Sequence, residues 1–385
     1  MKQGWKTCKF ADVFDLQMGK TPSRDNPTYW GDDNMWVSIA DMNEQKYMSA
    51  TKEGITDVAV QESGIKPIPK GTVIMSFKLS IGKVSIATSK LYTNEAIMGF
   101  IEKEEGTLVP EYLYYYLKGY KWEGANKAAM GMTLNKKTIA ENTISYPPIA
   151  EQEKIVAELD CLSGIIEKKK QQLKELDALA QSIFYEMFGD PIENDMGWEV
   201  KTYGCEFPIS SGGTPDTKNN LYWDNGDISW IGSNLCHDEI IYKNDGKYIT
   251  KEGFDNSSAK EYQYGFVLVA LVGATIGKTA LLRFNTTTNQ NVAGINVPAN
   301  KNFVPEFIFY HLQKLYELFM GIGNGKFKMA NLRFIRELPL IVPPLTLQQD
   351  FASKIEAIEK QKELIKQSIQ ETETLFNSRM DYYFN

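Results

Sequence analysis

Residues 144–155 read ISYPPIAEQEKI, and residues 340–351 read LIVPPLTLQQDF. In both stretches a short apolar run leads into a Pro-Pro pair, and a glutamine follows shortly after, Gln152 in one copy and Gln348 in the other. Each Pro-Pro pair separates a long stretch of mixed character from a shorter stretch with the periodicity of a helix. Because the same boundary occurs twice, the sequence indicates one unit written twice.

The repeat keeps its register along the chain of 385 residues, with the two copies about half a chain apart. Solenoid repeats have periods of roughly 20–50 residues, so this much longer period predicts two whole domains. The matching pairs are Gly4-Trp5 with Gly197-Trp198, GKTP at 19–22 with GGTP at 212–215, Tyr29-Trp30 with Tyr222-Trp223, Trp36 with Trp230, Thr93-Asn94 with Thr288-Asn289, and Pro110 with Pro305.

Each copy divides into a mixed stretch and a helical one. The mixed stretches contain short β-branched or aromatic runs, such as GTVIMSF at 71–77 and ISWIGS at 228–233, between Gly, Asn, Asp and Pro residues. This pattern favours an α+β fold, with one helix after Pro110, EYLYYYLKGY at 111–120, and its copy after Pro305, EFIFYHLQKLYELF at 306–319. We predict mixed domains at 1–148 and 190–344, each followed by a long helix, at 149–189 and 345–385.

The two helical stretches carry apolar residues at alternating spacings of three and four, which is typical of a coiled-coil seam. Two stripes of matched length, each on a helix of about 38 residues, predict that the helices pack together as an antiparallel pair with pseudo-two-fold symmetry. The seam comprises Leu159, Leu162, Ile166, Leu173 and Leu176 in the first helix and Ile355, Ile358, Ile365 and Ile369 in the second, with interruptions at Lys169, Lys362, Thr372 and Arg379.

Residues 271–282, LVGATIGKTALL, are similar to a nucleotide-binding P-loop, but the match fails by one position. Val272 stands where the first glycine is required, and Gly273 comes one residue too late. The copy of this stretch, FKLSIGKVSIA at 77–87, has Val84 where a P-loop needs Ser or Thr. We therefore predict a strand, a glycine turn and a second strand at both places, and no nucleotide site.

The composition bears on where in the cell the protein is found and on whether it binds a metal. The chain is 43% hydrophobic and 12% aromatic, enough for two or more globular cores, and its longest apolar run, at 266–274, is too short to span a membrane. Because no apolar segment follows the start MKQGWKTCKF, we expect a cytoplasmic protein. The four cysteines and two histidines, His237 and His311, show no metal-ligand spacing, so no metal site is predicted.

The order of mixed domain, Pro-Pro pair, AEQEKI and a long helix ending in MFGDPI, followed by the same order again, resembles the specificity subunit of type I restriction-modification enzymes. The resemblance covers essentially the whole chain. It rests on GKTPSRDNPTYW at 19–30, GGTPDTKNNLYW at 212–223, the two Ile-Gly-Lys turns and the two Pro-Pro stretches. The second copy departs modestly from the pattern, with TLQQ where the first has AEQE.

This resemblance implies two target recognition domains, each reading one half of a bipartite double-stranded DNA target, while the helices set the spacer and dock methyltransferase subunits. The family's specificity subunit is not an enzyme. Two methyltransferase subunits use S-adenosylmethionine to modify adenine, and restriction subunits use ATP and magnesium, so no cofactor is expected in this chain. An amino-group methyltransferase would carry an Asp/Asn-Pro-Pro-Tyr/Phe tetrapeptide, and the Pro-Pro pairs here stand in SYPPI and IVPPL.

The charge distribution is compatible with DNA binding despite a net charge of -7. Residues 150–190 hold nine acids and five lysines, and residues 345–385 hold seven acids and five bases, so the helical segments carry most of the negative charge. The mixed domains are nearly neutral, and basic residues gather in the last third of each. We predict phosphate contacts from Lys127, Lys136 and Lys137 in the first domain and from Lys326, Lys328 and Arg333 in the second.

Polar side chains on loops are the expected means of reading bases. The Gly-Thr-Pro and Ile-Gly-Lys frames recur in both copies while the flanking residues differ, which suggests a shared frame and two unlike half-sites. The candidates are Thr21, Ser23, Arg24 and the turn lysine Lys83 in the first copy, and Thr214, Lys218 and Lys278 in the second.

Two other functions remain open at the level of sequence. A metal-dependent nuclease would use Pro215-Asp216 with Asp245-Gly246-Lys247, although the first copy has Ser23 in place of the aspartate. Alternatively, the chain is a protein-interaction scaffold whose coiled coil binds protein partners and whose domains bind something other than DNA.

Overall fold

A computed structural model describes residues 4–43, 45–78, 80–123, 126–128, 131–322 and 329–384. The chain divides into two compact units, Met1–Lys170 with Gln367–Asn385 (unit 1) and Gln171–Lys366 (unit 2). The two long helices, α5 (Ile149–Phe188) and α11 (Leu345–Phe384), each contribute to both units. Each unit therefore combines one mixed domain with one part of each long helix.

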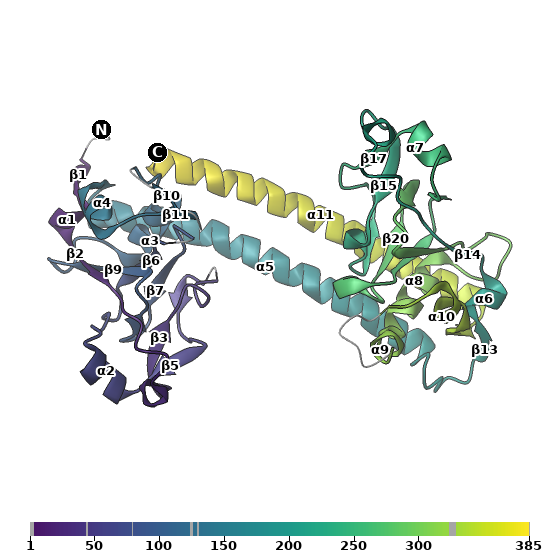
Figure 1. Ribbon diagram of the computed structural model, residues 1–385, viewed down its shortest axis with the longest axis horizontal. Helices are drawn as coiled ribbons and strands as arrows, with labels where there is room; N and C mark the ends of the chain where they lie inside the picture. The colour runs from purple at the N-terminus through teal and green to yellow at the C-terminus, as the bar shows by residue number, and fades with distance from the viewer. Residues whose placement is uncertain are drawn as a thin grey trace. The chain divides into compact units, whose positions relative to one another are not determined.

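In unit 1 a five-stranded sheet has the order β2-β9-β6-β7-β4, and a three-stranded sheet has the order β5-β3-β8 (Figure 1). Pairing is antiparallel except between β4 and β7 and between β3 and β8. Two further pairs are β1-β12 and β10-β11. The strands are β1 Lys6–Lys9, β2 Phe14–Met18, β3 Trp30–Val37, β4 Tyr47–Met48, β5 Glu53–Ile55, β6 Val73–Ser76, β7 Val84–Ala87, β8 Tyr92–Thr93, β9 Ile97–Glu102, β10 Asn126–Ala128, β11 Gly131–Thr133 and β12 Thr143–Tyr146.

Unit 2 repeats this arrangement with one additional strand, β18, in its smaller sheet. Its sheets have the orders β14-β22-β19-β20-β16 and β17-β15-β21-β18, with a separate pair β13-β23, and the parallel pairs are again the corresponding ones, β16 with β20 and β15 with β21. The strands are β13 Glu199–Thr202, β14 Ile209–Ser211, β15 Ile228–Ile231, β16 Glu239–Ile241, β17 Tyr248–Ile249, β18 Glu261–Tyr262, β19 Val267–Ala270, β20 Thr279–Leu282, β21 Thr286–Thr288, β22 Val292–Ile295 and β23 Pro339–Val342.

Short helices complete both units, and the fold is α+β and duplicated, as predicted. The helix expected after Pro110 is α3, which packs against β6 and β7. Its copy after Pro305 is shorter than predicted, because Leu315 interrupts it and separates α8 from α9. The helices are α1 Phe10–Val13, α2 Asp57–Ser63, α3 Pro110–Gly119, α4 Lys136–Glu141, α6 Tyr203–Glu206, α7 Lys251–Asp255, α8 Pro305–Lys314, α9 Tyr316–Met320 and α10 Leu332–Glu337, and the 3-10 turns are η1 Pro27–Tyr29, η2 Asn220–Tyr222, η3 Ser233–Leu235 and η4 Gly273–Thr275.

Both Ile-Gly-Lys segments are turns between antiparallel strands. Gly82 joins β6 to β7 with a φ of 89°, and Gly277 joins β19 to β20 with a φ of 76°. Glycine is required at such left-handed positions because a Cβ would be strained there. Since Lys278 is followed by β20 and not by a helix, the prediction of a strand-turn-strand element is confirmed.

The start of each long helix belongs to the core of the domain that precedes it. Ile155 and Leu159 of α5 are buried in the main core of unit 1, together with Met380 near the end of α11. In unit 2 the main core takes Phe351 from the start of α11 and Phe184 from the end of α5. A helix that is built into two hydrophobic cores cannot move independently of either domain's local packing.

Gln152 explains why the Pro-Pro stretch recurs. Its side chain is fully buried, and its Oε1 accepts a hydrogen bond from the Val109 backbone N–H at 2.8 Å, at the N-cap of α3. Its Nε2 donates to the carbonyl oxygens of Pro147 at 2.9 Å and Thr107 at 3.2 Å. One amide therefore ties the first turn of α5 to the loop before α3.

Gln348 makes the same connections in unit 2. This buried side chain accepts from the Val304 N–H at 3.2 Å, at the N-cap of α8, and donates to the carbonyls of Pro343 at 2.9 Å and Asn302 at 3.1 Å. The Pro-Pro stretch is thus a structural junction between domain and helix in both units.

The helix pairing is antiparallel within each unit. In unit 1, Glu158 of α5 contacts Arg379 of α11, and Lys169, further along α5, contacts the earlier residue Ser368. In unit 2, Phe184 of α5 packs on Phe351 of α11 with ring centroids 5.6 Å apart. The predicted seam residues Leu159, Ile166, Ile355 and Ile358 are buried, and Leu162, Leu173, Leu176, Ile365 and Ile369 are half-buried.

The charged residues that interrupt the seam are paired across it. Lys169 Nζ donates to the Ser368 carbonyl at 3.3 Å and to Thr372 Oγ1 at 3.3 Å. Lys362, only 8% exposed, forms ion pairs with Asp177 across the helices and with Glu359 on its own helix, both at 2.7 Å. Polar groups at seam positions fix the register of a helix pair, because a shifted register would bury them without partners.

Replacing Gln152 by leucine is expected to destabilise unit 1 by about 2–4 kcal/mol. The change keeps the side-chain volume but leaves one buried N–H and two carbonyls without partners. Urea unfolding followed by hydrogen exchange would report the two units separately. The exposed neighbour supplies the control, since Glu153→Gln should leave stability unchanged, and an equally stable Gln152→Leu protein would contradict the junction described here.

His311 is fully buried in α8 of unit 2. Its Nδ1 lies 2.8 Å from the Tyr203 hydroxyl, and its Nε2 accepts from the Ile341 N–H at 3.3 Å. Burial lowers the pKa of His311 from its ordinary 6.5 to about 3, because the charged imidazolium is disfavoured away from water. The equivalent residue in unit 1 is Tyr116, whose hydroxyl accepts from the Ser145 N–H at 3.1 Å.

Unit 2 should therefore lose stability as the pH falls below about 6.5. Unfolded His311 binds a proton there while the folded form does not until about pH 3, so the free energy of unfolding decreases by up to about 1.4 kcal/mol per pH unit. His311→Gln, although less stable at pH 7, should show a shallower decline between pH 6.5 and 5. The exposed His237 offers the matched control, and equal slopes for wild type and His311→Gln would disprove the assignment.

Candidate nucleic-acid interface

The loop after β2, which begins GKTP, is anchored by a close approach between backbones. Gly19 N donates to the Ile97 carbonyl at 3.2 Å, and Lys20 N donates to the Thr93 carbonyl at 2.8 Å. A Cβ on Gly19 would lie 2.1 Å from the Thr93 oxygen, so only glycine fits. The contact joins two motifs that recur in the sequence, Gly-x-Thr-Pro and Thr-Asn.

The GGTP loop after β14 is held in the same way. Gly212 N donates to the Val292 carbonyl at 3.3 Å and Gly213 N to the Thr288 carbonyl at 2.8 Å, and a Cβ on Gly212 would lie 2.1 Å from Thr288 Oγ1. The Gly-x-Thr-Pro and Thr-Asn motifs therefore recur in the sequence because both units make the same tertiary contact.

A tryptophan pair supports the loop in unit 1. The indole N–H of Trp36 donates to the Lys20 carbonyl, and that of Trp30 donates to the Ser23 carbonyl, both at 3.2 Å. The two rings meet edge to face with centroids 5.1 Å apart. The loop backbone is thus fixed at two points by rigid side chains.

The equivalent pair in unit 2 has nearly the same geometry. Trp230 donates to the Gly213 carbonyl and Trp223 to the Asp216 carbonyl, both at 3.1 Å, and the ring centroids are 5.2 Å apart. These tryptophans recur in the sequence, but no role was predicted for them. Their nearly equal spacing from the Gly-Thr-Pro motif in the two copies, identical for Trp30 and Trp223 and one residue longer for Trp230 than for Trp36, was the signal that could have indicated it.

The side chains that this frame presents differ between the units. In unit 1 the Arg24 guanidinium lies 3.7 Å from the centre of the Trp30 ring and pairs with Glu53 through two hydrogen bonds, at 2.6 and 2.9 Å. The hydrogen bond from Arg24 lowers the pKa of the Glu53 carboxyl. In unit 2 the loop position of Arg24 is taken by the exposed Thr217, and Lys247 precedes β17 where Glu53 begins β5.

Four other predicted loop residues are placed as follows. Thr21 donates a hydrogen bond to Glu95, and Thr214 donates to Gln290 at 2.6 Å, so both threonine hydroxyls serve the frame. Ser23 and Lys218 are exposed beside them. The two threonine hydroxyls therefore position the loops, while the side chains of Ser23 and Lys218 are exposed to solvent.

The two turn lysines have different surroundings. Lys278 forms an ion pair with Asp238 at 2.6 Å and lies 4.7 Å from the centre of the Tyr316 ring. Lys83 has a distant backbone contact, its Nζ lying 3.4 Å from the Ile39 carbonyl. The positive charge of Lys278 is compensated within its own unit, so the two copies are not electrostatically equivalent here.

Three of the predicted phosphate-contacting residues lie on α4 and α10, each of which has an asparagine N-cap, Asn135 and Asn331. Lys136 and Lys137 are exposed in the first turn of α4, with Glu141 4.0 Å from Lys137, and Arg333 pairs with Glu337 at 2.7 Å on α10. Such exposed pairs are weak and leave the cations accessible. Lys127 lies in β10, whose side chains are not described, and Lys326 and Lys328 fall outside the described residues.

No group of three or more His, Cys, Asp or Glu side chains suited to a metal ion occurs among the described residues. Asp216 accepts from the Lys218 backbone N–H at 3.0 Å, and Asp245 lies 3.9 Å from Lys247. Within the described part of the chain, no helix is both long and apolar enough to cross a membrane.

The structure thus shows a duplicated α+β domain, with long helices paired within each unit and one loop frame that carries two different sets of side chains. The family model described as "Type I restriction modification DNA specificity domain" matches residues 2–178 and 196–374. The chain therefore belongs to the type I restriction-modification specificity family, and it contains two copies of the family's domain.

Individual relatives agree with this assignment. The MjaIX specificity subunit of Methanocaldococcus jannaschii is 27% identical over 379 residues, which cover 92% of this chain and 86% of the relative. The HindI specificity subunit of Haemophilus influenzae is 28% identical over 178 residues, 44% of this chain and 38% of the relative.

Solved structures show the same fold at low identity. The specificity subunit from M. genitalium superposes with a TM-score of 0.54 at 14% identity, covering 98% of this chain and 95% of that one. A chain from a study of complex assembly and conformational transition in a type I restriction-modification system gives a TM-score of 0.61 at 17% identity, covering 100% and 98%.

Proposed function

We propose that this chain is the subunit that selects the DNA target of a type I restriction-modification complex, with each mixed domain reading one half of a bipartite double-stranded sequence. One observation carries the proposal. Both units build the same tryptophan-supported loop but present different side chains from it, Arg24 paired with Glu53 in one, and Thr217 and Lys247 at the corresponding positions in the other. A shared frame with different outer groups is suited to reading two unlike half-sites.

Arg24 is the strongest candidate for direct base reading. Stacking on Trp30 and pairing with Glu53 restrict its rotamers, so little conformational entropy remains to be lost on binding. A guanidinium has five N–H donors, and those not used by Glu53 can face a base edge. Arginine most often contacts the O6 and N7 acceptors of guanine in the major groove, so we assign it a guanine in the first half-site.

Phosphate contacts would come from the exposed cations Lys136, Lys137 and Arg333, together with Lys127, Lys326 and Lys328. Such contacts add affinity without sequence preference and make binding sensitive to salt. The acidic excess on the long helices is no obstacle, because it lies on segments to which we assign protein partners rather than DNA.

The paired helices would set the spacer and dock two methyltransferase subunits, with restriction subunits as further partners. Support comes from the length of α5 and α11 and from the seam contacts of Lys169 and Lys362, which fix one register. The chain itself would be non-catalytic, and S-adenosylmethionine, ATP and magnesium would be bound by the partner subunits.

Arg24→Ala, assembled with its methyltransferase partner, should relax the target at one position of the first half-site. Losing one bidentate base contact costs about 1–3 kcal/mol of discrimination. A map of methylated adenines in treated DNA gives the readout, with Thr217→Ala as the matched change expected to affect the second half-site alone. Methylation by the purified chain without a partner, or an unaltered target for Arg24→Ala, would refute the corresponding part of the proposal.

Adding one heptad to each long helix, after Gln172 and after Ser368, tests the spacer role. The insertions keep the seams in phase and lengthen the pair by about 10.5 Å, which corresponds to about three base pairs of DNA. They also turn the half-sites by about 100° relative to each other, so methylation of the original target should fall and any surviving target should have a longer spacer. Full activity of a folded enlarged protein on the original spacer would show that the helices do not set the distance.

A further inference from the structure

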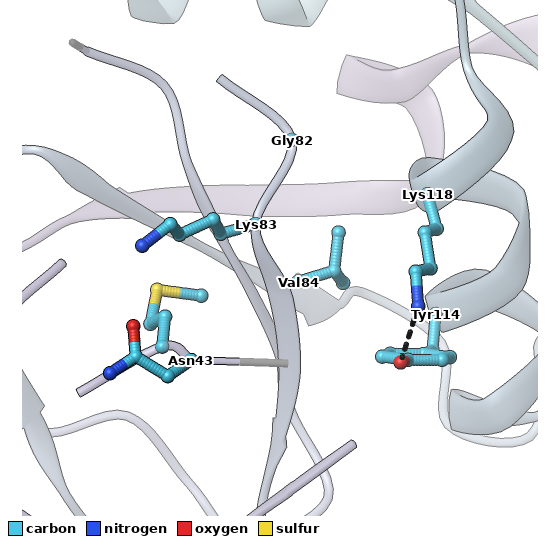
Figure 2. Close-up of a pocket in the computed structure, with 7 residues that line it drawn as sticks. Asn43, Gly82, Lys83, Val84, Tyr114 and Lys118 are labelled. Atoms are coloured by element: carbon cyan, nitrogen blue, oxygen red, sulfur yellow. Dashed lines mark hydrogen bonds between the residues drawn. The ribbon is translucent and has the colours of Figure 1, made fainter. Parts of the chain in front are cut away.

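Unit 1 contains a pocket of about 460 Å³ between the turn at Gly82 and helix α3. In Figure 2, Lys83 extends from the turn on the side of Val84 where Asn43 lies, and Lys118 extends from α3 on the other side, where its ammonium is directed toward the Tyr114 hydroxyl. Asn43 lies below Lys83 in this view. The remaining lining residues are Met42, Gly82 and Val84.

The polar groups of this Lys83–Lys118 pocket are all hydrogen-bond donors or can act as donors. They are two ammonium groups, the Tyr114 hydroxyl and the Asn43 amide, and none of the seven described lining residues is acidic. Within the described residues the contacts of the two ammoniums are long, 3.4 Å from Lys83 to the Ile39 carbonyl and 3.4 Å from Lys118 to the Tyr114 hydroxyl. Since N–H···O bonds cluster near 2.9–3.0 Å, both lysines retain donor capacity for an anion.

The same place in unit 2 is electrically neutralised. Lys278, the counterpart of Lys83, pairs with Asp238, whose carboxylate also accepts from the Thr279 N–H at 2.9 Å. Gln313 of α8 stands where α3 has Lys118, and its amide oxygen accepts from Gln181 at 2.5 Å. Two positive groups of unit 1 are thus replaced by a compensated lysine and a neutral amide.

Strand register identifies what replaces Asp238 in unit 1. Tyr47 of β4 pairs with Ile86 of β7, and Ile240 of β16 pairs with Leu281 of β20 in the corresponding parallel pair. Stepping back two residues from Tyr47 and from Ile240 leads to Gln45 and Asp238, respectively. The carboxylate that neutralises the turn lysine in unit 2 is therefore an uncharged amide side chain in unit 1.

We propose that Lys83 and Lys118, on the two sides of this pocket, each contact a phosphate of the DNA backbone beside the first half-site, and that unit 2 has no counterpart of this site. This inference rests on the proposed function, and it adds a contact with DNA that only unit 1 makes. Two ammoniums with a hydroxyl and an amide are the groups that proteins use to hold phosphate oxygens. The pocket volume falls in the range of about 300–1,000 Å³ typical of ligand sites.

The site predicts that Lys83 and Lys278, which align in the two copies, differ in their contribution to DNA binding. In the complex with its methyltransferase partner, Lys83→Gln and Lys118→Gln should each weaken DNA binding and reduce the slope of log affinity against log salt by about one unit, or about two for the double variant. The methylated sequence should stay the same, because phosphate contacts carry no base information. Lys278→Gln, the matched change in unit 2, should leave the slope unaltered.

Lys83→Arg and Lys118→Arg keep the charge and should retain the wild-type slope, which separates loss of a phosphate contact from loss of local structure. An unchanged slope in the Lys83→Gln/Lys118→Gln variant would overturn the site. If that variant also assembled less well with the methyltransferase partner, the pocket would instead bind an acidic side chain of that partner. Equal slope losses for Lys83→Gln and Lys278→Gln would overturn its one-sidedness. If the wild-type complex retained no specific DNA at all, the proposed function itself would fail, whatever the lysine variants did.

Discussion

The buried amide at the start of each long helix is the constraint on which the arrangement of both units depends. Gln152 and Gln348 each satisfy one N–H and two carbonyls that would otherwise be buried without partners. Buried polar groups carry a penalty of about 1–3 kcal/mol when left unpaired, so the junction tolerates little alternative geometry. The direction in which each helix leaves its domain is therefore set by hydrogen bonding as well as by apolar packing.

Beyond that junction, polar contacts decide how the helices pair. Apolar seam residues such as Ile166 and Ile358 could pack in several registers, because one aliphatic side chain resembles another. Lys169 and Lys362 cannot shift in this way, since each meets particular partners on the facing helix. Near the end of α11, the Arg379 guanidinium adds two hydrogen bonds to the Glu158 carboxylate. The geometry of these contacts favours one register of the helix pair.

The two copies have the same loop frame, but the side chains that this frame presents differ between them. The glycine contacts and the indole hydrogen bonds agree between the units to within small differences in distance, and the order of the five-stranded sheet is the same in both. Differences lie where side chains leave the frame, at Arg24 against Thr217 and at Lys83 against Lys278. His311 and Tyr116 show the same principle in the core, because two different side chains accept a hydrogen bond at one equivalent position.

The sequence by itself determined the duplication, the α+β class, the long helices and their antiparallel pairing, because each leaves a periodic or repeated pattern in the residues. It also excluded a P-loop at Gly277, since that motif depends on spacing along the chain. It missed the break at Leu315 between α8 and α9, which the continuous apolar pattern conceals.

Only the tertiary structure decided which residues meet across long sequence separations. The pairing of Arg24 with Glu53, of Lys278 with Asp238, and the shared pocket of Lys83 and Lys118 all depend on strand register and on packing between elements. The identity of a residue as lysine is enough to show that its side chain is positively charged. Its neutralisation depends on a neighbour brought close by folding, and no local pattern in the sequence records that distance.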